Sequence, residues 1–157
     1  MNPKVTMLAA VVACSALLPP AFAADPEPPV APDPLSVARQ RIAEKRWPAA
    51  VDELKRVGAT SSADWNNLMG YSLRRASPPD YPAAERYYDE ALRIDPRHKG
   101  ALEYSGELYL LLGRLEDAEK RLATLDKACF FPCEEYSDLK RAVARYKAAG
   151  NKYVAAP

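Results

Sequence analysis

Apolar residues recur along most of this chain at the spacing of an amphipathic helix. In residues 81–94 they lie three or four positions apart, at Tyr81, Ala84, Tyr88 and Ala91. That spacing places all of them on one side of a helix with about 3.6 residues per turn. Similar patterns predict a helix pair over residues 35–57 and single helices over 64–76, 99–112, 115–127 and 134–148. The sequence therefore predicts an all-α protein.

The helical pattern repeats at a step of 34 residues. Four columns keep this step over three repeats: Trp47, Tyr81 and Leu115; Ala50, Ala84 and Ala118; Leu54, Tyr88 and Leu122; Val57, Ala91 and Leu125. Gly70 and Gly106 are 36 residues apart, because residues 77–80 lengthen one turn. Small residues at fixed places let paired helices approach closely while aromatic rings fill the space between them.

These columns resemble the tetratricopeptide repeat (TPR) family over roughly residues 35–128. The resemblance implies a right-handed α-solenoid of about three TPR helix pairs, with the helix at 134–148 covering the end of the array. Residues 100–143 also look like a group of small exported bacterial TPR proteins, in which a CxxxC turn follows the last repeat. That second resemblance supplies no partner.

The N-terminal residues have the features of an export signal. Lys4 precedes an apolar run at 5–18, and Ala21-Phe22-Ala23 fits a signal-peptidase site. We therefore expect a signal peptide, a Pro-rich spacer, a TPR domain with its capping helix and a disordered tail, at residues 1–23, 24–34, 35–149 and 150–157. Cleavage would place a chain without a membrane span in the periplasm, whereas a lipobox-like sequence before Cys14 offers lipid anchoring as the alternative.

Composition narrows the classes of function. A length of 157 residues with 48% hydrophobic residues suits one packed domain. The net charge of +1 gives no indication of a nucleic-acid partner. A single histidine, His98, leaves little room for His-based catalysis, and the sequence has no Ser/His/Asp set and no phosphate-binding loop. We predict no enzymatic activity, no catalytic residue, no metal and no cofactor.

Two cysteines, Cys129 and Cys133, remain after the predicted cleavage. In an exported chain they are expected to form a disulfide that fixes the angle between the last repeat and the capping helix. A thiol-redox role is an alternative. Against it, the pair is CxxxC rather than CxxC, and Glu134 and Glu135 would disfavour a thiolate.

The candidate binding residues come from the TPR resemblance, because the first helix of each TPR pair lines the concave surface. By the repeat register these partner-binding residues are Asn67, Tyr71, Arg74, Glu103, Glu107 and Leu110, with Arg39 as a further candidate. The set suits an extended peptide of mixed charge and differs from the family's clamp for C-terminal carboxylates. The tyrosines at 81, 87, 88, 104 and 109 mostly fall at packing positions and are predicted to be core.

The sequence thus predicts a protein–protein interaction module in the bacterial cell envelope, which binds a peptide or protein partner in its concave groove. A self-associating structural subunit, acting as a homo-oligomer, is one alternative. A thiol-redox protein using Cys129 and Cys133 is the other. The identity of the partner is left open.

Overall fold

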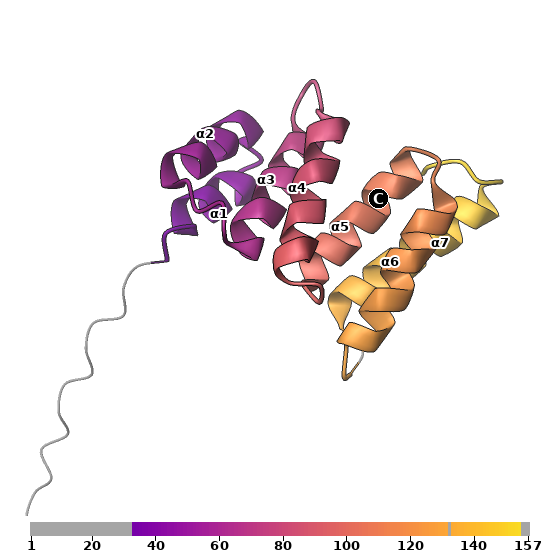
Figure 1. Ribbon diagram of the computed structural model, residues 1–157. Coiled ribbons are helices and arrows are strands. Elements are labelled where there is room, and N and C mark those ends of the chain that lie inside the picture. Colours follow the sequence, from indigo (N-terminus) through magenta and orange to yellow (C-terminus); the bar gives the residue numbers. More distant parts are fainter. Residues whose placement is uncertain (1–32, 132, 155–157) are drawn as a thin grey trace, which may run out of the picture. The chain divides into compact units, whose positions relative to one another are not determined.

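The computed structural model describes residues 33–131 and 133–154. The predicted signal peptide, most of the Pro-rich spacer and the last three residues lie outside the described residues. The described part contains seven helices and no strand (Figure 1). They are α1 (Ser36–Ala43), α2 (Trp47–Val57), α3 (Ala63–Arg75), α4 (Tyr81–Ile94), α5 (Lys99–Leu111), α6 (Leu115–Ala128) and α7 (Glu134–Ala148). None of the described helices combines the length and the apolar character that crossing a membrane requires.

Local sequence signals set the ends of these helices. The side chains of Ser62, Asp80 and His98 each accept a hydrogen bond from the backbone N–H three residues further on, at 3.2, 2.9 and 3.1 Å. These bonds satisfy N–H groups that the first turn of a helix leaves without a partner. Helix α2 ends at Gly58, whose φ of 64° is a left-handed conformation that glycine adopts without a steric penalty.

The helices pack as successive antiparallel neighbours, with α3 against α4 and α5 against α6 (Figure 1). The first helices of the pairs also contact one another, from α1 to α3, from α3 to α5 and from α5 to α7. Two clusters of buried apolar residues fill the space between them. One surrounds Leu54, Trp65 and Met69, and the other contains Tyr88, Leu125 and Leu139.

Glycine allows the closest helix contacts. A Cβ atom at Gly70 would lie 2.9 Å from the Tyr88 ring and 3.0 Å from the Ala84 carbonyl oxygen. A Cβ atom at Gly106 would lie 2.6 Å from a methyl carbon of Leu139 in α7. Real Cβ contacts are longer than these, so a larger residue at Gly70 would push α3 from α4, and one at Gly106 would displace the Leu139 side chain.

The segment between α6 and α7 carries the two cysteines. Their Cα atoms lie 5.9 Å apart, and the two sulfur atoms are at disulfide-bonding distance. The geometry is compatible with the predicted disulfide. Oxidation of the pair in the cell stays a prediction.

Candidate functional site

Helices α3 and α5 lie side by side. They bring three of the predicted partner-binding residues and one further tyrosine into one surface. We call this surface the α3–α5 face; it consists of Tyr71, Arg74, Tyr104 and Glu107. The Tyr71 and Tyr104 rings are 4.6 Å apart between centroids, and Tyr71 also makes an edge contact with Trp47 at 5.9 Å. Both tyrosines are partly exposed. Tyr104 packs against the core, as the sequence predicts, but it is also partly exposed at this surface.

A buried ion pair crosses the α3–α5 face. Arg74 donates from Nη2 to Glu107 Oε2 at 2.9 Å, and its side chain is 5% exposed against 26% for Glu107. The guanidinium carbon also lies 5.6 Å from the Tyr71 ring centroid and 5.7 Å from the Tyr104 ring centroid. These distances are in the range of cation–π attraction. Arg74 is therefore held from three sides and fixes the spacing of α3 and α5.

Glu103 lies beside this ion pair and is 8% exposed. Burial, reinforced by the nearby carboxylate of Glu107 and those of Asp138 and Glu135, raises the pKa of Glu103 to about 8. Burial and Glu103 also raise the pKa of Tyr104 to about 12. Glu103 is consequently protonated at neutral pH and carries an O–H that can donate a hydrogen bond.

The raised pKa of Glu103 predicts a pH-dependent stability. The folded state holds this proton between pH 4.5, the ordinary value, and about 8, so stability falls as pH rises through that window. Removing the carboxyl group abolishes this pH-dependent loss, so the change in unfolding free energy caused by Glu103→Gln should be more favourable at pH 8.5 than at pH 4.5, by up to about 4 kcal/mol for the full shift. Urea titrations at the two pH values measure this difference. The matched control Glu116→Gln, at an exposed position of α6, should show none; equal pH profiles for both variants would contradict the assignment.

Two other predicted residues are less accessible than the sequence suggested. Asn67 is 7% exposed, and its Oδ1 has no hydrogen-bond partner among the described residues. Leu110 is 1% exposed and belongs to the same apolar cluster as Leu139 and Tyr146 of α7. Helix α7 covers this part of α5, so Leu110 is a core residue and offers no surface to a partner. It is left out of the site.

A pocket of about 350 Å³ continues the α3–α5 face toward the α3–α4 turn. Its lining joins Arg74, Glu107 and the repeat residue Tyr81 to residues that the sequence did not single out, namely Arg75, Ala76, Pro79, Leu111 and Tyr153. Arg75 is exposed, and its guanidinium lies 5.5 Å from the Trp47 ring centroid. Tyr153 follows the last helix and is 42% exposed. No sequence pattern indicated that this C-terminal residue would lie near α3.

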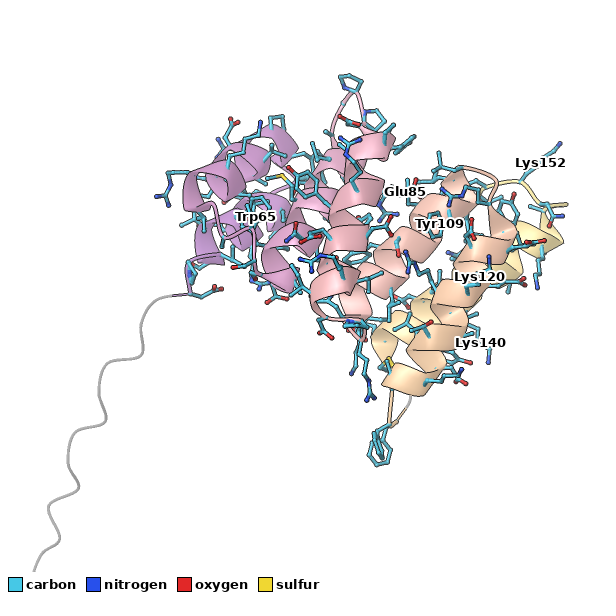
Figure 2. The ribbon with its side chains drawn as sticks, in the orientation of Figure 1. Trp65, Glu85, Tyr109, Lys120, Lys140 and Lys152 are labelled. Carbon is cyan, nitrogen blue, oxygen red and sulfur yellow. A yellow bond between two sulfur atoms is a disulfide. The ribbon has the colours of Figure 1, made fainter. Side chains whose placement is uncertain are left out.

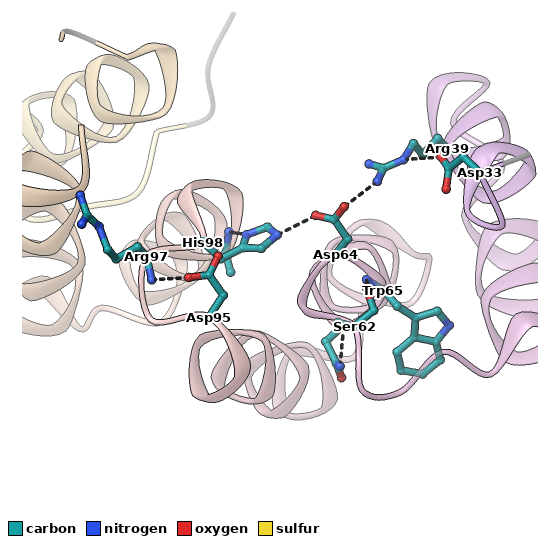
Figure 3. A network of polar contacts seen from close by, with 10 residues as sticks. Asp33, Arg39, Ser62, Asp64, Trp65, Asp95, Arg97 and His98 are labelled. Carbon is teal, nitrogen blue, oxygen red and sulfur yellow. Dashed lines mark hydrogen bonds and ion pairs between the residues drawn. The ribbon is translucent and has the colours of Figure 1, made fainter. Parts of the chain in front are cut away.

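Arg39 belongs to a polar network at the start of α3 and α5 (Figure 3). Its Nη2 donates to Asp64 Oδ2 at 3.0 Å, and Asp64 Oδ1 lies 2.9 Å from His98 Nε2. Because His98 Nδ1 accepts the capping hydrogen bond of α5, we assign the ring proton to Nε2, which donates to Asp64. The hydrogen bond from His98, with Arg39, lowers the pKa of Asp64. The network ties α1, α3 and α5 together.

Comparisons with known proteins agree with this architecture. The tetratricopeptide repeat family model matches residues 80–143. No curated protein sequence matches the chain. Among solved structures, the chain is similar to the Yersinia enterocolitica type III secretion chaperone SycD in complex with a peptide of the translocator YopD. The TM-score is 0.60 at 18% identity, over 74% of this chain and 88% of that chain.

The fold is therefore that of a TPR-type helical solenoid. This confirms the predicted all-α class, and the family match supports the resemblance read from the repeat columns over residues 80–128.

Proposed function

We propose that this protein is a non-catalytic interaction module of the bacterial cell envelope, which binds an extended segment of a partner protein across the α3–α5 face. The TPR-type fold supports a binding role, and the similar SycD structure was solved with a bound peptide. One observation carries the proposal. Two partly exposed tyrosine rings, 4.6 Å apart, lie beside the Arg74–Glu107 pair and lead into the pocket of about 350 Å³.

The side chains of this surface indicate which kind of peptide segment it would bind. Tyr71 and Tyr104 offer flat apolar area for a side chain of the partner. The exposed guanidinium of Arg75 lies at the pocket and can pair with a carboxylate. Glu107, still 26% exposed, can accept a hydrogen bond from a backbone N–H or a basic group. The proposed ligand is thus an extended peptide with an apolar residue next to an acidic one.

Site-specific photo-crosslinking in the native cell tests this proposal. A photoreactive phenylalanine analogue placed at Tyr104 should form a crosslink to one protein, and Arg75→Glu in the same chain should weaken that crosslink at least about tenfold, as loss of a charged contact predicts. The control position is Lys120, which is exposed on α6. Equal crosslinking from Lys120, or none from Tyr104, would contradict binding at the α3–α5 face.

The envelope location rests on the first 23 residues, which lie outside the described residues. We expect the protein in the periplasmic fraction, with Ala24 as its first residue by N-terminal sequencing or intact mass. A mass that includes an acylated Cys14 would assign it instead to a lipid-anchored form. A full-length chain that starts at Met1 in the cytoplasm would overturn the proposed location.

A further inference from the structure

The most exposed large apolar side chains of the described residues are adjacent. Phe130 and Phe131 are 93% and 82% exposed, in the segment between Cys129 and Cys133. We call these two residues the Phe loop. Two neighbouring aromatic side chains left in water are unfavourable for an isolated domain and mark an interaction site. Two carboxylates, Glu134 and Glu135, come three and four residues after Phe131, in the first turn of α7.

A second pocket, of about 580 Å³, has the complementary chemistry. We call it the α3–α4 pocket; its lining is Thr60, Ser61, Trp65, Asn66, Arg86, Tyr87, Glu90 and Arg93. Trp65 and Tyr87 form an edge-to-face pair with ring centroids 5.8 Å apart, and Figure 2 labels Trp65 between the helices of the first two pairs. Arg86 is exposed, and the charge of Glu90 is already balanced by Arg93 at 2.7 Å. The pocket is aromatic with a net positive rim.

The Phe loop and the α3–α4 pocket lie along the same edge of the helical array. Arg97, in the turn after α4, contacts the carbonyl oxygens of Lys127 and Ala128 at 3.4 and 3.3 Å. The start of the Phe loop is therefore next to that turn. The pocket reaches Arg93, in the last turn of α4, from the other side. The α4–α5 turn, residues 95–98, thus separates the two features.

We infer that two copies of this chain associate by reciprocal exchange, with the Phe loop of each copy seated in the α3–α4 pocket of the other. A two-fold axis near the α4–α5 turn brings each loop to the opposite pocket, because the turn lies between the two features. Such an interface uses the same patch on both copies and closes as a dimer. In this arrangement Glu134 and Glu135 approach Arg86 of the other copy.

The surface area that the proposed dimer would bury is close to that of a specific protein–protein interface. A buried aromatic side chain removes about 150–250 Å² from water, and two exchanged loops bury four such side chains. With the pocket walls included, the total approaches the lower end of the about 1,200–2,000 Å² that specific interfaces bury. A membrane surface is a poorer match, since the three carboxylates of Asp126, Glu134 and Glu135 outnumber the two nearby cations, Arg97 and Lys127, and anionic lipid attracts basic segments.

Analytical ultracentrifugation of the mature chain over a range of concentrations tests the exchange. The wild type should reach a dimer and no larger species. Phe130→Ser with Phe131→Ser should weaken dimerisation at least about tenfold, as expected for loss of aromatic anchors. Arg86→Glu should do the same, through repulsion of Glu134 and Glu135. The matched control is Leu112→Ser, at an exposed apolar residue of the α5–α6 turn, which should leave the dimer intact.

Mixing the two defective proteins separates reciprocal exchange from other modes of association. The loop variant retains its pocket and the Arg86→Glu variant retains its loop, so an equimolar mixture should form heterodimers through one remaining contact. Adding Glu134→Lys and Glu135→Lys to Arg86→Glu should restore the homodimer by reversing both charges. A wild type that stays monomeric, or a dimer unaffected by the loop substitutions, would overturn the proposal. Loop-dependent binding to anionic vesicles by a monomer would also overturn it.

Discussion

Replacing Tyr88 with alanine is expected to lower the free energy of unfolding by about 3–5 kcal/mol, the cost of removing a buried aromatic ring. Tyr88 has no exposed surface, and its ring fills the space that Gly70 leaves between α3 and α4. The neighbouring helices can collapse only partly into that space, so a cavity would remain. Urea denaturation followed by circular dichroism measures the change.

Tyr88→Phe is the matched control. The Tyr88 hydroxyl is buried and has no hydrogen-bond partner among the described residues. Its removal leaves the ring packing intact and relieves a desolvated polar group, so Tyr88→Phe should be within about 1 kcal/mol of the wild type or more stable. A loss as large as that of Tyr88→Ala would show that the hydroxyl, rather than the ring, stabilises the contact.

The second large effect is expected at the ion pair of the α3–α5 face. Arg74→Met should lower the free energy of unfolding by about 2–3 kcal/mol, less than for a fully buried pair because Glu107 keeps some contact with water. The substitution preserves much of the side-chain volume but leaves Glu107 and Glu103 as neighbouring carboxyl groups without a cation. The same urea titration, at pH 7, gives the value.

A double substitution separates the charge from the packing. Arg74→Met combined with Glu107→Gln removes both charges, so no unpaired carboxylate remains at the centre of the face. We expect the double variant to be more stable than Arg74→Met alone. If the two losses simply add, the ion pair contributes no coupling energy, and the cation–π contacts with Tyr71 and Tyr104 become the main role of Arg74.

Local signals were sufficient to predict the helices. The predicted α4 and α7 have the observed bounds, α5 and α6 differ from prediction by one residue at the C-terminal end, and α3 is shifted by one residue at both ends. Several of these helices begin or end at a residue that acts through its own backbone or its immediate neighbours. Ser62 and Asp80 cap the following helix, and Gly58 ends α2 in a left-handed conformation. Such effects can be read from a short stretch of sequence.

The accessibility of the site residues depends on contacts between repeats. Arg74 and Leu110 occupy equivalent positions, 36 residues apart, and both were predicted to face a partner. The side chain at each position instead contacts the helix that follows two along in the array, which is α5 for Arg74 and α7 for Leu110. Arg74 meets Glu107 of α5, while Leu110 joins the cluster that includes Leu139 of α7. The repeat register identifies the helix face but does not say how much of it the next helix covers.

The remaining parts of the candidate surfaces join residues that are distant in sequence. Tyr153 reaches the pocket beside Arg74, and the α3–α4 pocket combines Thr60 with Arg93. No periodic pattern links such positions, because their proximity follows from how the chain returns after each helix. The exposure of Phe130 and Phe131 likewise required the structure, since an apolar turn in a sequence equally predicts a buried segment.

The contact between Gly106 and Leu139 has a consequence for the length of the array. The Leu139 side chain occupies the small space above Gly106 on α5, where the first helix of another repeat would have to pack. Duplication of a repeat at this end would therefore first require α7 to leave α5. Insertion of a whole 34-residue unit between existing pairs is the easier way to lengthen this protein. Helix α7 would then remain packed against the last helix pair.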